Sequence, residues 1–276
     1  MGVYVDDVAA CGSGLAREAY DRLAPVYDLF TEGYDHATWL GELESLALEH
    51  GLGGRRLLDL ACGTGKSFLP MLERGYRVSA CDVSPAMVAL AAEKVSGRDV
   101  DLFVADLCDL PDAGPADLVT CLDDAMNYLV GDGDLALALR GIERCLRPGG
   151  LALFDVNTLA TYRSSFASDA VVEGPGSFLC WHGLVNAGDF GEGDVAEAAI
   201  EVFGEQPGGC WTRTTSRHVQ RHRPLAEVAE AVAGASLELL AVRGQARGGR
   251  LVPYGGELAH PKLVYLAGKP TFGGAT

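Results

Sequence analysis

The segment Leu57–Ser67 (LLDLACGTGKS) combines an apolar run, a tight turn with two glycines and the start of a helix. Such a turn can bring backbone N–H groups and a helix N-terminus up to a ligand, because glycine has no side chain to keep the backbone away. Several kinds of nucleotide-containing ligand are bound in this way. The turn is therefore the first candidate binding site in the chain.

Two familiar spacings of such a turn do not fit these residues. A phosphate loop of the nucleotide-triphosphatase type needs Gly-x-x-x-x-Gly-Lys-Ser. Residues 65–67 (GKS) match its end, but Leu60 occupies the position of its first glycine. A dinucleotide fold needs Gly-x-Gly-x-x-Gly. Gly63 and Gly65 fit that spacing, but Phe68 fills the third position, where its ring would obstruct close packing of helix on strand.

A third pattern, Asp-x-Ala-x-Gly-x-Gly, fits at every fixed position, with Asp59, Ala61, Gly63 and Gly65. It resembles motif I of the class I S-adenosylmethionine-dependent methyltransferases, which usually have glycine where Ala61 stands. The resemblance extends over about residues 55–157 and includes Arg-Pro-Gly-Gly before the fifth expected strand. It implies S-adenosylmethionine as the cofactor and methyl transfer as the reaction.

The resemblance also assigns residues to that cofactor. Asp82 would accept hydrogen bonds from both ribose hydroxyls, and Asp106 would accept one from the adenine amino group. Asp59 would be either a direct ligand or an anchor for the glycine loop. Three apolar residues would enclose the adenine: Val83, Met87 and Leu107. The complete expected cofactor-binding set is Tyr20, Asp59, Ala61, Gly63, Thr64, Asp82, Val83, Met87, Asp106, Leu107 and Leu122.

The turn after the fourth expected strand, residues 123–128 (DDAMNY), is the first candidate for an acceptor site. Its adjacent carboxylates, Asp123 and Asp124, are candidate catalytic groups because they can anchor an amine or take a proton from a hydroxyl. Alternatively, one of them caps the following segment and the other is solvated. Asn127 and Tyr128 resemble residues that sugar and amino-acid methyltransferases use near the methyl group, so both are expected to bind substrate.

The N-terminal segment 20–28 (YDRLAPVYD) resembles the lid of small-molecule methyltransferases, in which tyrosines close over the cofactor. Aromatic rings stabilise a sulfonium by a cation–π attraction of ~0.5–2 kcal/mol. We therefore expect Tyr20 at the cofactor, and Tyr27 and Trp39 in the substrate pocket. The alternative is that these rings pack as core residues of amphipathic helices.

Residues 158–223 contain aromatic and β-branched runs but no long helix, which predicts an antiparallel β insert. Trp181 offers an apolar wall for substrate, and His218 is a candidate general base. Four arginines would share one face of a continuous strand, where they either recruit an acidic acceptor or pair with nearby Asp and Glu: Arg213, Arg217, Arg221 and Arg223. His218 and His222 have the spacing of a helical metal pair, but a third ligand is not evident, so no metal is expected.

Alternating strands and helices must position these residues. The expected strands cover 56–61, 77–83, 100–107, 117–122, 151–156, 237–242 and 263–267. This order predicts a Rossmann-like three-layer α/β sandwich with a mostly parallel seven-stranded sheet. We expect three parts: an N-terminal helical lid (1–54), a methyltransferase core (55–157 and 224–270) and the antiparallel insert after strand five (158–223), which would cover the substrate site.

The composition narrows the class of protein. The 276 residues are 48% hydrophobic and 22% charged, which excludes wholesale disorder. No run approaches the ~18 apolar residues of a membrane span. A formal net charge of −16 opposes a general nucleic-acid binder. Eight cysteines without a Cys-x-x-Cys pair, and a start without a basic signal-peptide region, predict reduced thiols in the cytoplasm.

Together these observations predict a cytoplasmic enzyme that methylates N or O of a small molecule, such as an amino sugar, an amino acid or a specialised metabolite of the antibiotic type. Neither a nucleic acid nor a membrane is expected as a partner, and a homodimer is compatible with the sequence. Three alternatives stay open: a tRNA or protein methyltransferase, a non-methylating protein that keeps the cofactor structurally, and a phosphate-loop hydrolase. Val119–Leu122 followed by Asp123 imitates the magnesium-binding strand of such hydrolases.

Overall fold

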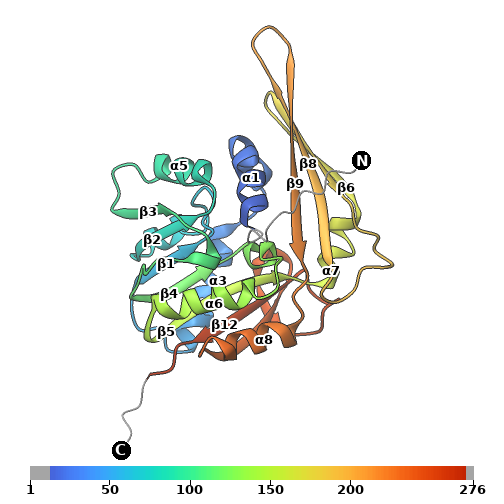
Figure 1. The fold of residues 1–276 in the computed structure, drawn as a ribbon. Coiled ribbons are helices and arrows are strands. Elements are labelled where there is room, and N and C mark those ends of the chain that lie inside the picture. The colour runs from blue at the N-terminus through green and yellow to red at the C-terminus, as the bar shows by residue number, and fades with distance from the viewer. Residues whose placement is uncertain (1–12, 272–276) are drawn as a thin grey trace, which may run out of the picture.

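The computed structural model describes residues 13–271 of the chain. Its main body is an eight-stranded sheet, sheet A, with helices on both faces (Figure 1). The strands of sheet A are β1 (Arg56–Leu60), β2 (Arg77–Asp82), β3 (Val100–Val104), β4 (Ala116–Cys121), β5 (Leu146–Asn157), β10 (Glu238–Gln245), β11 (Leu251–Pro253) and β12 (Lys262–Gly268).

Sheet A has the strand order β11-β10-β12-β5-β4-β1-β2-β3. Strands β1 to β5 are parallel, whereas β12 runs antiparallel to β5 and β10 runs antiparallel to β12. The Rossmann-like sandwich is thus confirmed, but the expected number of seven strands is wrong. The additional strand, β11, pairs over three residues with the end of β10. So short a run gives no alternation by which a strand is recognised in sequence.

Helices precede, connect and follow the strands. The α-helices are α1 (Ser13–Leu23), α2 (Tyr27–Phe30), α3 (His36–Glu49), α4 (Leu69–Glu73), α5 (Pro85–Lys94), α6 (Asp134–Cys145), α7 (Leu159–Tyr162) and α8 (Leu225–Gly234). The 3-10 helices are η1 (Ala24–Val26), η2 (Leu107–Asp109), η3 (Ala125–Tyr128), η4 (Ser165–Ala167) and η5 (Arg247–Gly249).

Local chemistry explains where several of these helices begin and end. Ser84 caps α5, because its hydroxyl accepts a hydrogen bond from the Met87 N–H at 3.1 Å. Asp35 caps α3 in the same way, with the Thr38 N–H at 3.0 Å. Pro25 has no N–H to donate, so the N-terminal helix is interrupted at η1 and α2 follows as a separate turn.

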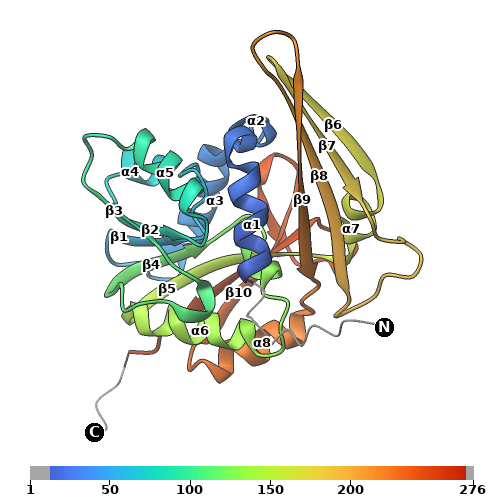
Figure 2. The same ribbon diagram turned by 45° about the horizontal axis from the view of Figure 1, so that its top comes forward.

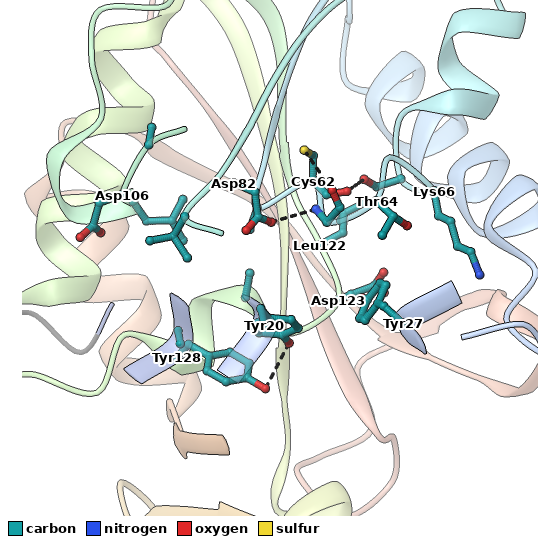
Figure 3. Close-up of a pocket in the computed structure, with 18 of the residues that line it drawn as sticks. Tyr20, Tyr27, Cys62, Thr64, Lys66, Asp82, Asp106, Leu122, Asp123 and Tyr128 are labelled. Carbon is teal, nitrogen blue, oxygen red and sulfur yellow. Dashed lines mark hydrogen bonds between the residues drawn. The ribbon is translucent and has the colours of Figure 1, made fainter. Parts of the chain in front are cut away.

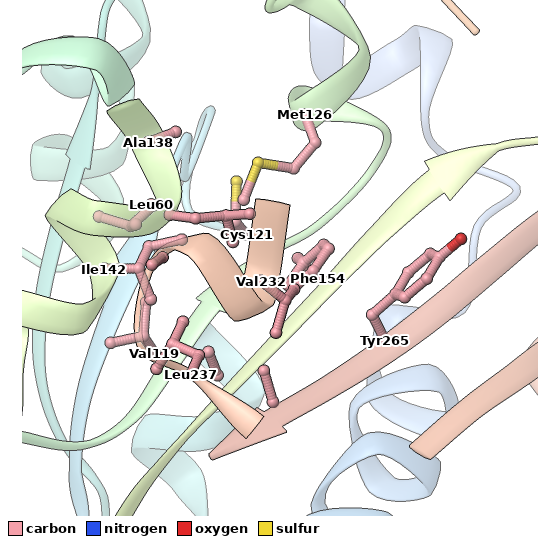
Figure 4. Close-up of a cluster of buried hydrophobic side chains, with 14 of the residues drawn as sticks. Leu60, Val119, Cys121, Met126, Ala138, Ile142, Phe154, Val232, Leu237 and Tyr265 are labelled. Atoms are coloured by element: carbon pink, nitrogen blue, oxygen red, sulfur yellow. The ribbon is translucent and has the colours of Figure 1, made fainter. Parts of the chain in front are cut away.

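Two apolar clusters join sheet A to its helices. On one face, Leu58 and Val119 pack with residues of α6 and α8 (Figure 4). On the other face, Leu57 and Val78 pack with residues of α3, α4 and α5. Because adjacent residues of one strand enter opposite clusters, both faces of the parallel sheet are buried, as the uninterrupted apolar runs predict. Phe154 and Tyr265 stack across β5 and β12 with ring centroids 5.2 Å apart.

The insert forms a second, antiparallel sheet, sheet B. Its strands are β6 (Asp169–Gly174), β7 (Ser177–Gly183), β8 (Val195–Glu205) and β9 (Trp211–Arg221), in the order β6-β7-β8-β9. Helix α1 stands between the helices of the parallel core and β9 (Figure 2). Leu23, Leu179 and Ile200 bury their side chains in this contact. Sheet B is therefore attached to the core through the N-terminal helix.

The arginines of β9 are used within the protein. Arg213 pairs with Glu201, and Arg217 pairs with Glu197, both across the β8–β9 ladder. Arg221 pairs with Asp132 at 2.8 Å. Arg223 lies beyond the end of β9 and is buried, so it does not share the expected basic face. Pairing with local carboxylates is the alternative that the structure bears out.

Two further findings concern the helices and the cysteines of the described residues. None of the helices in residues 13–271 is long and apolar enough to cross a lipid bilayer. The described cysteines form no disulfide, and four of them are buried: Cys62, Cys81, Cys121 and Cys145. Cys11 lies outside the described residues.

Candidate functional site

Two cavities adjoin where the parallel strands of sheet A end. The first, the strand-end cavity, is lined by the loops that follow β1, β2, β3 and β4 and by α1–α3 (Figure 3). The second, the sheet-B cavity, has a volume of about 630 Å³ and lies between α1, α2, sheet B and the turn after β4. Ligands of open α/β sheets bind at the carboxyl ends of the strands, so both cavities lie at the expected edge.

The glycine turn forms the floor of the strand-end cavity. Gly63 has φ +53° and Gly65 has φ +91°, a left-handed backbone that glycine adopts without strain. A β-carbon added at Gly65 would lie 2.9 Å from the Phe68 ring, which is closer than atoms pack. A β-carbon at Gly63 would lie 3.5 Å from the Tyr27 ring. The turn therefore passes directly beneath the Tyr27 ring.

Asp82, at the end of β2, lies beside this turn. Its carboxylate accepts a hydrogen bond from the Gly63 N–H at 2.8 Å (Figure 3). It accepts another from the Ser84 N–H at 2.9 Å. Burial raises the pKa of Asp82 to about 6, although these two N–H groups oppose the shift. A carboxylate has about four acceptor positions, so Asp82 keeps acceptor capacity for a ligand in the cavity.

Most of the expected cofactor-binding residues line the strand-end cavity. They are Tyr20, Ala61, Gly63, Thr64, Asp82, Val83, Asp106, Leu107 and Leu122. Thr64 donates from its hydroxyl to Asp28 at 2.6 Å, which ties the glycine turn to α2. Asp106 caps η2 by accepting from the Cys108 N–H at 2.9 Å.

Asp59 and Met87 lie outside the cavity. Asp59 is fully buried and accepts hydrogen bonds from the hydroxyls of Ser67 and Thr120, the latter at 2.5 Å. Burial raises the pKa of Asp59 to about 7, although these hydroxyls oppose the shift. Asp59 is thus the anchor of the glycine loop, one of its two expected roles. Met87 is fully buried at the first turn of α5.

Trp39 and Asn127 also lie outside both cavities, so their expected contact with substrate is not found. Trp39 is fully buried in the apolar cluster that joins α3 to sheet A. Asn127 is fully buried as well. Its amide donates to the Arg221 carbonyl and accepts from the Asn157 N–H, both at 2.9 Å. The first is a packing residue, and the second connects the turn after β4 to β5 and β9.

Five residues line both cavities and thus mark their junction: Tyr20, Tyr27, His36, Asp123 and Tyr128. Three expected acceptor-site residues line the sheet-B cavity alone: Asp124, Trp181 and His218. These eight residues come from α1, α2, α3, the turn after β4, β7 and β9. A ligand in the strand-end cavity and another in the sheet-B cavity would meet among three tyrosines, an imidazole and a carboxylate.

The turn after β4 has an unusual backbone. Asp123 and Asp124 are consecutive residues in the left-handed region, with φ +57° and +59°. Non-glycine residues rarely adopt this conformation, although Asp tolerates it better than most. The buried Asp155 carboxylate accepts hydrogen bonds from both backbone N–H groups, at 3.1 Å for Asp123 and 2.6 Å for Asp124. Asp155 therefore holds the turn in the conformation that turns the Asp123 side chain to the junction.

Lys262 neutralises part of this acidic cluster. Its Nζ lies 2.9 Å from Asp124 Oδ1, 3.5 Å from Asp155 and 3.8 Å from Asp123. Burial would lower the pKa of Lys262, but the three carboxylates raise it well above its usual value. Burial raises the pKa of Asp155 to about 6, against the effect of Lys262. The cluster thus contains three carboxyl groups around one lysine.

A chain of hydrogen bonds leaves the junction toward sheet B. The Tyr20 hydroxyl donates to the Tyr128 hydroxyl at 3.1 Å (Figure 3), which lies 2.9 Å from Nδ1 of His218. Nε2 of His218 lies 3.1 Å from the Ser216 hydroxyl. Burial lowers the pKa of His218 to about 4, so its ring is neutral at pH 7. Nδ1 of this neutral ring accepts a hydrogen bond from the Tyr128 hydroxyl. The Tyr20 oxygen is left as an acceptor at the junction.

Several residues of the site were not expected from the sequence. His36, Asp155 and Lys262 are the most prominent, and Gln220 donates to Asp124. Each of them is at least 31 positions away in the chain from the Asp123 or Asp124 group that it contacts, so no local spacing in the sequence indicates the contact. The one available signal was position: Asp155 is the last residue but one of an expected strand, and Lys262 immediately precedes another. Among residues 13–271, His, Cys, Asp and Glu form no group of three or more suited to a metal ion.

Comparisons with known proteins relate part of the sequence, and the fold, to methyltransferases. Residues 57–150 match the family model of a methyltransferase domain. A putative methyltransferase of Bacillus subtilis (strain 168), YqeM, is 33% identical over 141 residues, which cover 50% of this chain and 56% of that protein. A dTDP-4-amino-2,3,4,6-tetradeoxy-D-glucose N,N-dimethyltransferase of Saccharopolyspora spinosa is 31% identical over 134 residues, which cover 48% of this chain and 53% of that protein. This chain spans about half the length of these curated relatives.

The fold comparison reaches further along the chain. The crystal structure of an S-adenosylmethionine-dependent methyltransferase from Clostridium acetobutylicum ATCC 824 superposes with a TM-score of 0.74 at 23% identity. The superposition covers 91% of this chain and 99% of that chain, so it extends well beyond residues 57–150. Residues 57–150 therefore match a methyltransferase domain, and the chain has the fold of an S-adenosylmethionine-dependent methyltransferase.

Proposed function

We propose that this chain transfers a methyl group from S-adenosylmethionine to a nitrogen atom of a small-molecule acceptor. The observation that carries the proposal is the junction of the two cavities. The strand-end cavity lies at the carboxyl ends of the parallel strands, where α/β folds of this type bind nucleotides, and the sheet-B cavity meets it at Asp123 and three tyrosines. Two ligands bound in this way would face each other across the junction.

The residues of the strand-end cavity fit S-adenosylmethionine. Asp82 has acceptor positions for ribose hydroxyls, and Asp106 has one for the adenine amino group. Val83 and Leu107 supply apolar walls for a purine ring. Gly63 lets its backbone approach the ligand beneath Tyr27, in a space that a β-carbon would narrow.

S-adenosylmethionine, when bound, supplies a methyl group on a positively charged sulfur, which leaves as a neutral thioether once the acceptor has taken the methyl. The chain's own task is to hold the acceptor in line with that bond and to keep water away. Tyr20, Tyr27 and Tyr128 line the junction, where their rings would stabilise a sulfonium by cation–π attraction. Helix α1 and sheet B line the sheet-B cavity and would cover a bound acceptor.

The acceptor-side residues have distinct roles in this proposal. Asp123 faces the junction and would anchor the amine or take its proton. Asp124 is held by Lys262 and Gln220 and would maintain the turn. His218 would act through Tyr128, by orienting the tyrosine hydroxyls, because its ring is already engaged on both sides. Methylation of nitrogen is supported by the names of relatives such as the amino-sugar N,N-dimethyltransferase.

Calorimetry tests the first half of the proposal. S-adenosylhomocysteine should bind with one site per chain, while ATP with Mg²⁺ and NAD should give no heat. The opposite pattern would identify a phosphate-loop or dinucleotide protein. Mass spectrometry of amine libraries incubated with S-adenosylmethionine tests the second half. Products heavier by one methylene are expected from amines; products from alcohols alone would reassign the acceptor atom.

The remaining expectations belong to the same proposal. The insert (158–223) would select the acceptor and the helices of residues 1–54 would form the lid. A cytoplasmic location agrees with the absence of disulfides among the described cysteines. The net charge of −16 argues against a nucleic acid as substrate. A homodimer would be recognised by sedimentation as twice the mass of the chain.

A further inference from the structure

We propose that the sheet-B cavity takes a positively charged amine that carries no phosphate group, rather than a nucleotide-linked one. This inference rests on the proposed function, since it specifies the acceptor of that reaction. It is carried by the distribution of charged side chains around the cavity. Acceptors of the two kinds differ by about two or three negative charges, so the cavity cannot suit both equally.

The charged groups that face the cavity are predominantly acidic. Asp123 and Asp124 line it, and Asp155 lies directly behind them. Lys262 is the one lysine or arginine among its described lining residues. All three carboxylates lie within 3.8 Å of Lys262 Nζ, so its charge is already shared. The two lining histidines are His36, which faces Asp123, and His218, which is neutral.

Other cations of the chain are committed elsewhere. Lys66 lines the other cavity and binds Asp28 and Thr31. Arg163 donates to the Phe190 carbonyl from two nitrogens, at 2.9 and 2.7 Å. Arg22 donates to the Thr215 carbonyl and to Glu18. Residues 1–12 and 272–276, which the structure does not describe, contain no Lys or Arg. A diphosphate in this cavity would therefore lose its hydration without gaining a cation.

The same cavity offers good partners to an ammonium group. The Asp123 side chain is 30% exposed, and it faces the junction with acceptor positions beyond the one that His36 occupies. Tyr20, Tyr27 and Tyr128 place their rings around this point. An ammonium group that loses water here donates charge-assisted hydrogen bonds to the carboxylate and gains cation–π contacts with the rings.

The far wall of the cavity indicates the rest of the acceptor. Phe30, Phe166, Trp181 and Ile200 line it with aromatic and aliphatic surface. A volume of about 630 Å³ accommodates a molecule of drug size. The acceptor class is thus an amine on an apolar or aromatic body. A free amino glycoside of low polarity or an arylalkylamine meets this description.

Calorimetry with three probes tests the inference on the full chain saturated with S-adenosylhomocysteine. The probes are benzylammonium, benzyl alcohol as its uncharged analogue, and thymidine diphosphate. We expect benzylammonium to bind at least tenfold more tightly than either of the other two. Thymidine diphosphate binding as tightly as benzylammonium, or more tightly, would overturn the inference, as would equal binding of the amine and the alcohol.

Substitutions locate the effect. Asp123→Asn keeps the side-chain size, and Asn tolerates the left-handed backbone of this position, so the fold should persist in circular dichroism. This substitution should lower the affinity for benzylammonium at least tenfold. Asp101→Asn removes the same charge from an exposed site on β3, at the far edge of sheet A, and should leave the affinity unchanged. Equal behaviour of the two variants would contradict a role for the cavity carboxylate.

Failure of the proposed function gives a different result. In that case S-adenosylhomocysteine would not bind, and the probes would be titrated into the unliganded chain. In these titrations, a preference for benzylammonium that is lost in Asp123→Asn would still show that the cavity selects a positive charge. No such preference would show that it does not. A chain that binds S-adenosylhomocysteine but prefers thymidine diphosphate would keep the methyltransferase proposal and reject this one.

Discussion

Nε2 of His36 lies 3.2 Å from Oδ2 of Asp123, although the two residues are 87 positions apart in the chain. Nδ1 of the same ring lies 3.1 Å from the Tyr34 carbonyl oxygen, which can only accept a hydrogen bond. These two contacts orient the ring with Nε2 toward the carboxylate. The start of α3 is thereby tied to the turn after β4, at the junction of both cavities.

The first prediction concerns this pair. Burial acts to raise the pKa of Asp123, but the hydrogen bond from His36 and the charge of Lys262 hold it below its usual value. In His36→Phe the donor is lost, so the pKa of Asp123 should rise. Ammonium binding needs the ionised carboxylate, and it should therefore fail at a higher pH than in the wild type. Benzylammonium titrations between pH 4 and 8 measure the midpoint.

His36→Gln serves as the control for that experiment, because its amide can still donate to Asp123. Its midpoint should stay near that of the wild type. A midpoint that is the same in the Phe variant, the Gln variant and the wild type would show that His36 does not set the charge of Asp123.

The second prediction concerns pH and cofactor affinity. With a pKa of about 6, Asp82 is protonated below pH 6, and a protonated carboxyl has fewer lone pairs for ribose hydroxyls. Affinity for S-adenosylhomocysteine should rise about tenfold from pH 5 to pH 7 and stay constant above. Asp82→Ala should weaken binding by ~1–3 kcal/mol at pH 7 and abolish the pH dependence. Asp59→Asn, which removes another carboxyl whose pKa is raised by burial, to about 7, should retain the dependence.

The third prediction concerns stability. Asp117 accepts hydrogen bonds from the backbone and side chain of Arg56 and from Arg147. Burial opposes the shift, but these bonds lower the pKa of Asp117 to about 2. Asp117→Asn should therefore reduce the free energy of unfolding by ~2 kcal/mol at pH 7. Since the depressed pKa stabilises only the ionised form, the difference should shrink as the pH falls from about 4 toward 2.

Urea denaturation measures that difference, and Asp169→Asn provides a comparison. Asp169 pairs with His182 at 3.2 Å, but its side chain is 74% exposed. Its loss should change the free energy of unfolding by less than ~0.5 kcal/mol. A similar effect of both substitutions would mean that burial of Asp117 does not strengthen its ion pairs.

The fourth prediction concerns the glycine turn. A β-carbon at Gly63 meets the Tyr27 ring only at 3.5 Å, an ordinary contact, so Gly63→Ala should fold. Its methyl group would nevertheless occupy the place where the backbone approaches the ligand. We expect at least a tenfold loss of affinity for S-adenosylhomocysteine. Gly97→Ala has a similar left-handed φ of +80° with no atom nearby and should lose stability but not affinity.

The sequence could predict the parts of this fold and site that depend on local pattern. The strand and turn within Leu57–Ser67 were predicted from an apolar run followed by two glycines, and the resemblance to methyltransferases pointed to the carboxylates that end β2 and follow β3. Such positions are set by the strand itself. The edge strand β11 was missed, since a strand of three residues lacks a recognisable alternation.

Local sequence pattern could not predict which side chains are buried or which residues far apart in the chain are in contact. Trp39 and Tyr27 are both aromatic residues of N-terminal helices, yet one is in the core and the other in the cavities. Which one faces inward depends on how α3 packs against sheet A. Lys262 meets Asp124 across 138 positions of sequence, a contact that exists only after β12 has inserted beside β5.

The five junction residues have one more consequence. Tyr20, Tyr27 and His36 precede the stretch that matches the methyltransferase domain, whereas Asp123 and Tyr128 lie within it. A fragment limited to residues 57–150 would keep the nucleoside end of the site and lose most of the opposite wall. Chimeras that exchange the first fifty residues together with sheet B would, by the same logic, inherit the acceptor preference of the donor protein and the nucleoside affinity of the recipient.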